Sequence, residues 1–374
     1  MQIFIVVPVK IDTEGLLVIL LKSKEGFILL IILLIFLIVS CSSMKIAAEG
    51  QFHNDYLSKS NTTAINGIFV VLVFLCHFAQ YVKFSPDFID QSFVFFKSHL
   101  GQLVVTTFLF FSGYGIICSI SKNGLDYVKA IPKKRFLSVL IHFDIAVILF
   151  MVVNVLLGKG FPIKENLIAL TGWESIGNSN WYIFAILALY LIVFLSFIVC
   201  KGNKYIGTAI TAIFTVGFVF VMILAKKPNY YYNTLICYPA GMIYGLFKDK
   251  FDKIIMHSDF VYTCFVAAAF AGFLFTYRIR GKGVEQFSLC CLFFIAVIVL
   301  VSMKIQLNNS FLQLMGNHVF AVYILQRIPM LLLSKIGLNN HAYIFLIASF
   351  IVTLGMTFVF DKCMSKIDKK LLKL

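Results

Sequence analysis

The chain consists of long apolar runs separated by short polar stretches. Roughly 20 apolar residues of helix cross a bilayer core about 30 Å thick. The runs lack the period-two alternation of membrane β-strands, which favours helices over a β-barrel. The pattern predicts about eleven membrane helices, near residues 27–43, 64–82, 102–120, 137–157, 180–200, 206–225, 232–247, 260–276, 285–303, 312–334 and 341–360.

We therefore expect an all-α polytopic membrane protein with about eleven transmembrane helices. The seventh run is short and contains Pro239 and Gly241, which predicts a broken or tilted helix there. The stretches between the runs are too short to hold a soluble domain.

Composition agrees with this interpretation. The chain is 60% hydrophobic and only 13% charged, whereas a soluble domain carries about 25% charged residues. This excludes a soluble enzyme, a nucleic-acid-binding protein and a disordered chain. The nine cysteines are scattered without a CxxC pair, so we predict neither a disulfide framework nor a metal site.

The net charge of +15 is first interpreted as orientation charge in the loops. The densest basic clusters, within residues 122–135 and 362–373, fall on the same side when eleven helices are counted. Basic loops favour the cytoplasm, so we predict a cytoplasmic C-terminus and an external N-terminus. An alternative for the first run is a lipoprotein signal cleaved before Cys41, but that processing would place both basic clusters outside.

Few ionisable residues lie inside the predicted helices, and each costs about 2.5–3.5 kcal/mol on insertion scales. His77 and Asn66 are eleven residues apart, so they lie about 20° apart on one helix face and roughly 16 Å apart along its axis. A neutral imidazole can take a proton from a hydroxyl and return it. The alternative for His77 is a structural hydrogen bond to a neighbouring helix.

The other intramembrane residues allow similar pairs of interpretations. Asp144 can orient a histidine or pair with a cation such as Arg327, and pairing is favoured. Arg327 itself can stabilise a developing oxyanion or form a structural ion pair. We expect His142 to serve packing and His318 to lie near the membrane interface.

The cluster Lys133-Lys134-Arg135 opens the fourth predicted helix. It can anchor the helix on the cytoplasmic side, or bind the phosphates of an anionic donor such as coenzyme A. The sequence leaves both interpretations open, because the same charges serve both.

In chain order these features resemble the membrane-bound acyltransferase 3 family, whose members acylate sugars and other cell-surface molecules. The segments that carry the resemblance are Asn66-Gly67-Ile68 through His77, Phe108-Leu109-Phe110-Phe111-Ser112-Gly113-Tyr114, Lys133-Lys134-Arg135-Phe136, Asn180-Trp181-Tyr182-Ile183 and Val322-Tyr323-Ile324-Leu325-Gln326. The chain departs from the family at Asn66, where a basic residue is frequent, and at Gln326, where a histidine is frequent. The basic role at Asn66 can pass to Lys59 or Arg327.

The resemblance covers about residues 60–360 and implies a ten-helix core. We divide the chain into an N-terminal segment with an additional helix (1–59), an integral membrane acyltransferase-like domain (60–361) and a basic tail (362–374). We assign catalytic roles to His77 and Arg327, acyl-CoA binding to Lys133, Lys134 and Arg135, and substrate binding to Asn66, Asp144, Trp181 and Tyr323.

The resemblance implies a multi-pass enzyme of the bacterial plasma membrane that moves an acyl group, by default acetyl, from cytoplasmic acyl-CoA to an envelope sugar. Its expected partners are acyl-CoA, a glycan or lipid-linked sugar, and the bilayer, without nucleic acid. Transfer can be direct or through an acyl-histidine. The alternatives are a transporter or flippase of lipid-linked glycans, and a polytopic glycosyltransferase. Trp173 and Trp181 can stack on a glycan, although anchoring at the membrane interface is favoured.

Overall fold

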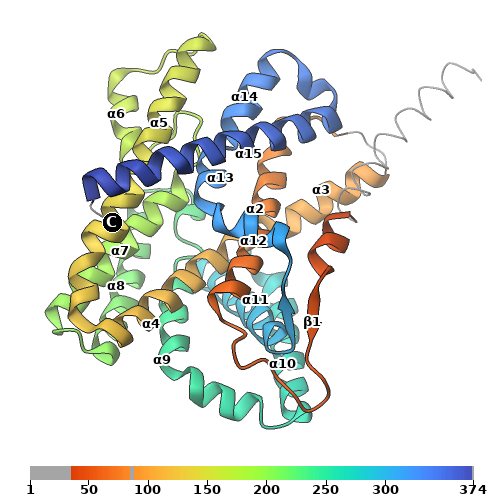
Figure 1. Ribbon diagram of the computed structural model, residues 1–374, viewed down its shortest axis with the longest axis vertical. Coiled ribbons are helices and arrows are strands. Elements are labelled where there is room, and N and C mark those ends of the chain that lie inside the picture. Colours follow the sequence, from red (N-terminus) through yellow and green to blue (C-terminus); the bar gives the residue numbers. More distant parts are fainter. Residues whose placement is uncertain (1–34, 85–87, 373–374) are drawn as a thin grey trace, which may run out of the picture.

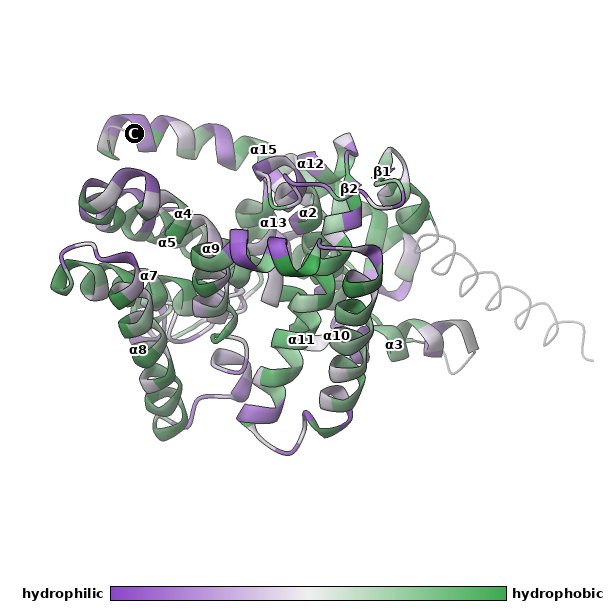
Figure 2. Cartoon of the chain, turned by 90° about the horizontal axis from the view of Figure 1, so that it is seen from below, coloured by the Kyte–Doolittle hydropathy of each residue, from purple (hydrophilic) through white to green (hydrophobic). Residues whose placement is uncertain are grey.

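The computed structural model describes residues 35–84 and 88–372, and most of this part of the chain is helical (Figure 1). The long helices carry the apolar runs. Figure 2 shows hydrophobic residues along these helices and hydrophilic ones gathered in loops and at helix ends. The helices are α2 (Lys59–Phe78), α3 (Phe88–Leu100), α4 (Thr106–Ile131), α5 (Ser138–Leu156), α6 (Ile163–Leu170), α7 (Trp181–Val199), α8 (Lys204–Leu224), α9 (Cys237–Ile255), α10 (Asp259–Ile279), α11 (Val284–Lys304), α12 (Ser310–Asn317), α13 (Val319–Leu325), α14 (Arg327–Lys335) and α15 (Ala342–Ile367).

Short elements connect these helices. Two strands pair antiparallel, with Met44 opposite Leu307 and Ile46 opposite Ile305. The short elements are β1 (Met44–Ile46), η1 (Gly101–Val105), the π-helical turn η2 (Pro132–Leu137), η3 (Asn229–Tyr231), β2 (Ile305–Leu307), η4 (Leu338–Asn340) and the π-helical turn η5 (Asp368–Leu372).

Seven helical segments within the described residues are long and apolar enough to cross a membrane. They confirm an all-α membrane protein but not the predicted count of eleven helices. One of them, residues 90–156, is a continuous helical run that covers two predicted helices. The predicted helix at 27–43 falls partly outside the described residues, and only residues 35–41 of it are described as helical.

The prediction of a single helix over 312–334 is wrong. That segment forms three short helices, α12, α13 and α14, with breaks at His318 and Gln326. Pro329 explains the second break, because it has no N–H to donate to the carbonyl of Leu325 and its ring crowds that carbonyl. The run at 232–247 also differs from a simple helix, since η3 and a loop precede α9.

Glycines bring two helix pairs into backbone contact. A Cβ on Gly67 of α2 would lie 2.1 Å from the carbonyl oxygen of Leu312 in α12, and one on Gly316 would lie 1.9 Å from that of Thr63. Helices in lipid associate through such small residues, because no hydrophobic effect drives them together. The broken segment is thereby held against the helix that carries His77.

The pair α4 and α9 is equally close. A Cβ on Gly113 would lie 2.0 Å from the carbonyl oxygen of Tyr238, and one on Gly241 would lie 2.0 Å from that of Phe110. Gly241, which the sequence marked as a possible helix breaker, lies inside α9 and serves this contact. The Phe108–Tyr114 segment is therefore partly a packing motif.

The start of α2 is fixed by Asn61, which is 3% exposed. Its amide nitrogen donates to the carbonyl of Tyr56 (2.7 Å), and its oxygen accepts from the N–H of Leu307 in β2 (2.9 Å). Nearby, Tyr56 donates to Asp252 (2.5 Å), and burial raises the pKa of this phenol, so it stays protonated as a donor.

The last helix is fastened to the bundle by two histidine–aspartate pairs. His318 pairs with Asp361, and His142 pairs with Asp368 at 2.9 Å. His142 does pack as expected, against the rings of Phe320 and Phe360, but it also makes this polar contact. The C-terminal end of α15 thus lies beside the first turns of α5.

Helix α2 runs through the middle of the molecule and defines its two ends (Figure 1). One end, which we call the Lys59 end, contains the start of α2 and the pair β1–β2. The other, the Gln80 end, contains the residues that follow α2 and the helix α14. Asn339 of η4 donates to the carbonyl of Tyr81 at this end (2.9 Å).

Candidate active site

The central cavity is a hollow of about 710 Å³ between α2, α4, α5, α7, α12 and α13. This volume lies within the range of about 300–1,000 Å³ that is typical of small-molecule sites. Its walls combine aromatic rings with hydroxyl, amide and cationic groups. Among the described residues, its polar and titratable lining groups are Lys59, Thr62, Asn66, Ser112, Tyr114, Ser119, Arg135, Tyr182, Tyr190, Asn317 and Tyr323.

Two cations lie at the Lys59 end of the central cavity. Lys59 opens α2, and Arg135 belongs to η2, the turn that Pro132 begins. Arg135 also donates through Nε to the hydroxyl of Tyr127 (3.2 Å), which orients its guanidinium. Lys133 and Lys134 are exposed and do not line the cavity, so the predicted basic cluster contributes one residue to it.

A bend in α4 makes this placement of Arg135 possible. Gly124 has φ +57° and ψ −144°, a combination that glycine can adopt because it has no Cβ. The chain turns there before it reaches η2, and Arg135 returns to the mouth of the cavity that Ser112 and Ser119 line from the same helix α4.

Asn66 lines the same cavity as Lys59, two turns further along α2. Its amide oxygen is buried and has no hydrogen-bond partner among the described residues. The family position at Asn66 is thus neutral here, but a cation lies on the same cavity wall.

Hydroxyl groups form the inner wall. Ser112 of α4 is hydrogen-bonded to Tyr182 and Tyr190 of α7. Tyr182 and Tyr190 are eight residues apart, with Ile186 between them on the same helix face, and all three line the cavity. Tyr190 was not predicted from the sequence, although a tyrosine repeated every two turns in an apolar helix is a readable signal.

Tyr323 closes the cavity toward the Gln80 end. Its ring lies 5.6 Å from that of Tyr182 and 6.2 Å from the imidazole of His77. Its hydroxyl is buried and receives no hydrogen bond from a side chain in the described chain. His77 does not itself line the cavity, so Tyr323 separates the imidazole from it.

His77 and Arg327, to which the sequence assigns catalytic roles, lie close together. Arg327 is near enough to His77 to act on it electrostatically, and its Nη2 donates to Gln80 (2.6 Å). Nδ1 of His77 and Nε of Arg327 are both buried without a hydrogen-bond partner among the described residues. These two atoms therefore have hydrogen-bonding capacity that the described residues do not use.

Asp144 occupies a different position from the one predicted. It forms no ion pair with Arg327 among the described residues, and one of its oxygens is buried without a partner. It does not line the central cavity. Arg327 instead engages the neutral side chains of Gln80 and Tyr81.

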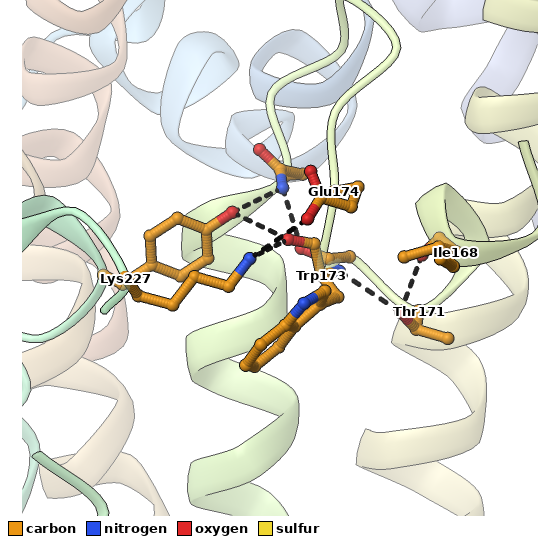
Figure 3. Close-up of polar contacts among 8 residues, drawn as sticks. Ile168, Thr171, Trp173, Glu174 and Lys227 are labelled. Atoms are coloured by element: carbon orange, nitrogen blue, oxygen red, sulfur yellow. Dashed lines mark hydrogen bonds and ion pairs between the residues drawn. The ribbon is translucent and has the colours of Figure 1, made fainter. Parts of the chain in front are cut away.

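The loop before α7 forms a compact polar cluster (Figure 3). Lys227 donates to the carbonyl of Trp173 (2.6 Å), and its ammonium lies 3.8 Å from the centre of the Trp173 ring. Tyr231 donates to the same carbonyl (3.1 Å), and burial raises its pKa to about 12. One face of Trp173 is covered in this way, which disfavours the sugar stacking considered above.

Trp181 packs behind the cavity-lining residues and does not reach the cavity itself. Its ring packs edge-on against Tyr182 and Tyr230 and does not line the central cavity. The preceding residue, Asn180, is buried and donates to the carbonyl of Gly172 and the hydroxyl of Tyr231, both at 2.8 Å. The Asn180–Ile183 segment thus fixes the start of α7 and places Tyr182 in the cavity.

A comparison with protein families identifies a relationship. A family model described as an acyltransferase domain matches residues 63–361, which include His77, Arg327 and most of the cavity lining. No curated protein and no solved structure gave a significant match to the chain.

Proposed function

The chain belongs to the acyltransferase 3 family, whose model covers residues 63–361, and we propose that it transfers an acyl group from acyl-CoA to a hydroxyl of a cell-envelope sugar. The observation that carries this proposal is the central cavity. It has cations at one end and is closed at the other by Tyr323, whose ring lies 6.2 Å from the imidazole of His77.

The donor occupies the central cavity from the Lys59 end. Its phosphates lie near Lys59 and Arg135, because cationic nitrogens form strong charge-assisted hydrogen bonds with phosphate oxygens. The pantetheine arm, which is long and thin, extends between the aromatic walls toward Tyr323. We place this end at the cytoplasm, because acyl-CoA is made there and because loops rich in Lys and Arg are usually cytoplasmic. Acetyl is the acyl group we propose.

The acceptor hydroxyl approaches His77 from the Gln80 end. The imidazole accepts the hydroxyl proton while the oxygen attacks the thioester carbonyl carbon. A C–O bond forms, the C–S bond then breaks, and the departing thiolate takes the proton back from His77. Arg327 stabilises the negative oxygen of the tetrahedral intermediate, since a fixed cation near developing charge lowers the barrier.

The proposal predicts that His77→Ala abolishes transfer. Isolated membranes that contain the chain should move labelled acetyl groups from acetyl-CoA to cell-surface polysaccharide, and the variant should lose about 10²- to 10⁴-fold in rate, the range of general base catalysis. The matched control is His53→Ala, a half-buried histidine at the Lys59 end that does not line the cavity. Retained transfer by a normally expressed His77→Ala protein would contradict the assigned role, and a transporter would transfer no label at all.

A further inference from the structure

The described residues form a second hollow at the Gln80 end, and its walls differ from those of two other hollows, which are mainly apolar. It measures about 300 Å³ and is lined by Gln80, Tyr81, Val82, Lys83, Asn339 and Asn340. We call it the polar pocket. Five of its six side chains carry hydrogen-bonding groups. The hollow beside Phe74 and Phe350 is lined by apolar side chains alone, and the one beside Phe265 by apolar side chains and Tyr244.

The polar pocket is built directly on the candidate catalytic residues. Gln80 follows His77 by one turn, and its backbone N–H donates to the His77 carbonyl (2.9 Å). The side-chain oxygen of Gln80 accepts from Nη2 of Arg327 (2.6 Å), and Tyr81 is hydrogen-bonded to the same guanidinium. Two wall residues therefore contact the cation that lies beside His77.

The opposite wall is also fixed in place. Asn339 donates to the backbone carbonyl of Tyr81 (2.9 Å), which ties η4 to the chain after α2. Asn340 and Lys83 are exposed, so their amide and ammonium groups are free to meet a molecule from outside the bundle. The pocket is thus open on one side. On the other side, its wall residues Gln80 and Tyr81 contact Arg327.

The chemistry of the walls indicates what the pocket binds. Amides offer a donor and an acceptor at once, a phenol offers both, and an ammonium donates three hydrogen bonds. Burial raises the pKa of Tyr81, so its hydroxyl stays protonated, although the guanidinium opposes this shift. Such paired donors and acceptors around a small hollow match the vicinal hydroxyls of a sugar ring, and an apolar acceptor would leave them unpaired at a cost.

We propose that the polar pocket is the acceptor subsite, which holds one sugar ring of a glycan with a hydroxyl directed at His77. This inference rests on the proposed acyl transfer and adds the place where the sugar acceptor binds. Arg327 joins the two parts, since it contacts the pocket wall and lies beside the imidazole. Donor and acceptor then reach His77 from opposite ends of the bundle.

The test uses the full-length protein with two variants that act by different means. Lys83→Gln combined with Asn340→Ala removes polar groups, whereas Asn340→Trp fills the hollow. All of these positions are exposed, so the fold should tolerate the changes. The control is Lys335→Gln, an exposed lysine of α14 that does not line the pocket. Two quantities are measured: the acetyl content of surface polysaccharide from expressing cells, and the shift in melting temperature that coenzyme A causes in the purified protein.

We expect both variants to lower polysaccharide acetylation at least tenfold and to keep the full shift with coenzyme A, while the control matches the unmodified chain. Unchanged acetylation in both variants would overturn the subsite and leave the acyltransfer proposal intact. Loss of the coenzyme A shift would also overturn it, because the pocket would then act on donor binding or on the fold. Acetyl groups found only in lipid would overturn the sugar as acceptor. If the unmodified chain acetylates nothing, the acyltransfer proposal itself fails.

Discussion

Single residues show where this bundle departs from simple apolar packing. Asn66, His77 and Arg327 each carry a buried polar atom without a partner among the described residues. Leaving a buried polar atom unpaired costs about 1–3 kcal/mol, and a bound molecule that supplies the missing partner recovers this free energy. The three residues follow the path we assign to the substrates, from the central cavity to Gln80.

At the same scale, Lys59 is the cation that can replace a basic residue at Asn66. We expect Lys59→Gln to raise KM for acetyl-CoA about fivefold, because it loses about 1 kcal/mol of charge-assisted phosphate binding, and to leave kcat nearly unchanged. Steady-state kinetics in membranes measures both constants.

The control for this variant is Lys45→Gln, since Lys45 lies in β1 at the same end but does not line the central cavity. An equal rise in KM for both variants would show that the effect comes from the general positive charge of this end. In that case Lys59 would have no specific role in donor binding.

Contacts between helices explain some of the residue types in the segments that resemble the family. Ser112, Gly113 and Tyr114 divide their tasks: the serine bonds the tyrosines of α7, the glycine admits α9, and the tyrosine lines the cavity. A segment that looks like one chemical motif therefore serves helix packing as well as the cavity. The break between α13 and α14, where Arg327 begins α14, has a local cause, because Pro329 interrupts the helical hydrogen bonds.

At this scale we predict that Gly113→Ala destabilises the protein by about 1–3 kcal/mol or more, because the new methyl group meets the backbone of Tyr238, which cannot swing away as a side chain can. The melting temperature in detergent reports the loss. Gly115→Ala, two residues along the same helix, is the matched control, since a Cβ there meets nothing within 4 Å. This control should be neutral or gain up to about 1 kcal/mol from helix propensity. Equal behaviour of the two variants would disprove the close contact.

At the scale of the whole molecule, α15 extends from one end of the bundle to the other. Phe345, near the start of this helix, packs against Tyr81, whereas Asp368, just beyond its end, pairs with His142 near the start of α5. The tail therefore shares an end of the bundle with Arg135, and both must face the same compartment. The positive-inside rule predicts that this compartment is the cytoplasm.

We accordingly predict that green fluorescent protein fused after Leu374 is fluorescent, whereas alkaline phosphatase fused there is inactive, because the first folds in the cytoplasm and the second only outside it. An insertion of the phosphatase within residues 158–162, in the loop between α5 and α6, should give the reverse result. An active phosphatase at the C-terminus would place the Lys59 end outside and reverse the direction of donor entry.

The sequence by itself determined the class of the protein and the family, and it singled out one candidate catalytic side chain. Long apolar runs exceed what a soluble core needs, so an all-α membrane protein followed from composition and spacing alone. The family resemblance is confirmed by a match over residues 63–361. His77 stood out because an ionisable group inside lipid is costly and therefore rare.

Only the tertiary structure decided how these residues meet. Spacing could not show that Arg135 lines a cavity while its neighbours Lys133 and Lys134 do not, since that depends on the bend at Gly124. It also favoured pairing Asp144 with Arg327, whereas Gln80 and Tyr81 fill that position. Hydrophobicity along a chain fixes which segments enter the membrane, but it does not encode which faces of different helices approach one another. That choice depends on backbone contacts between helices, such as those at Gly67 and Gly113, which exist only in the folded bundle.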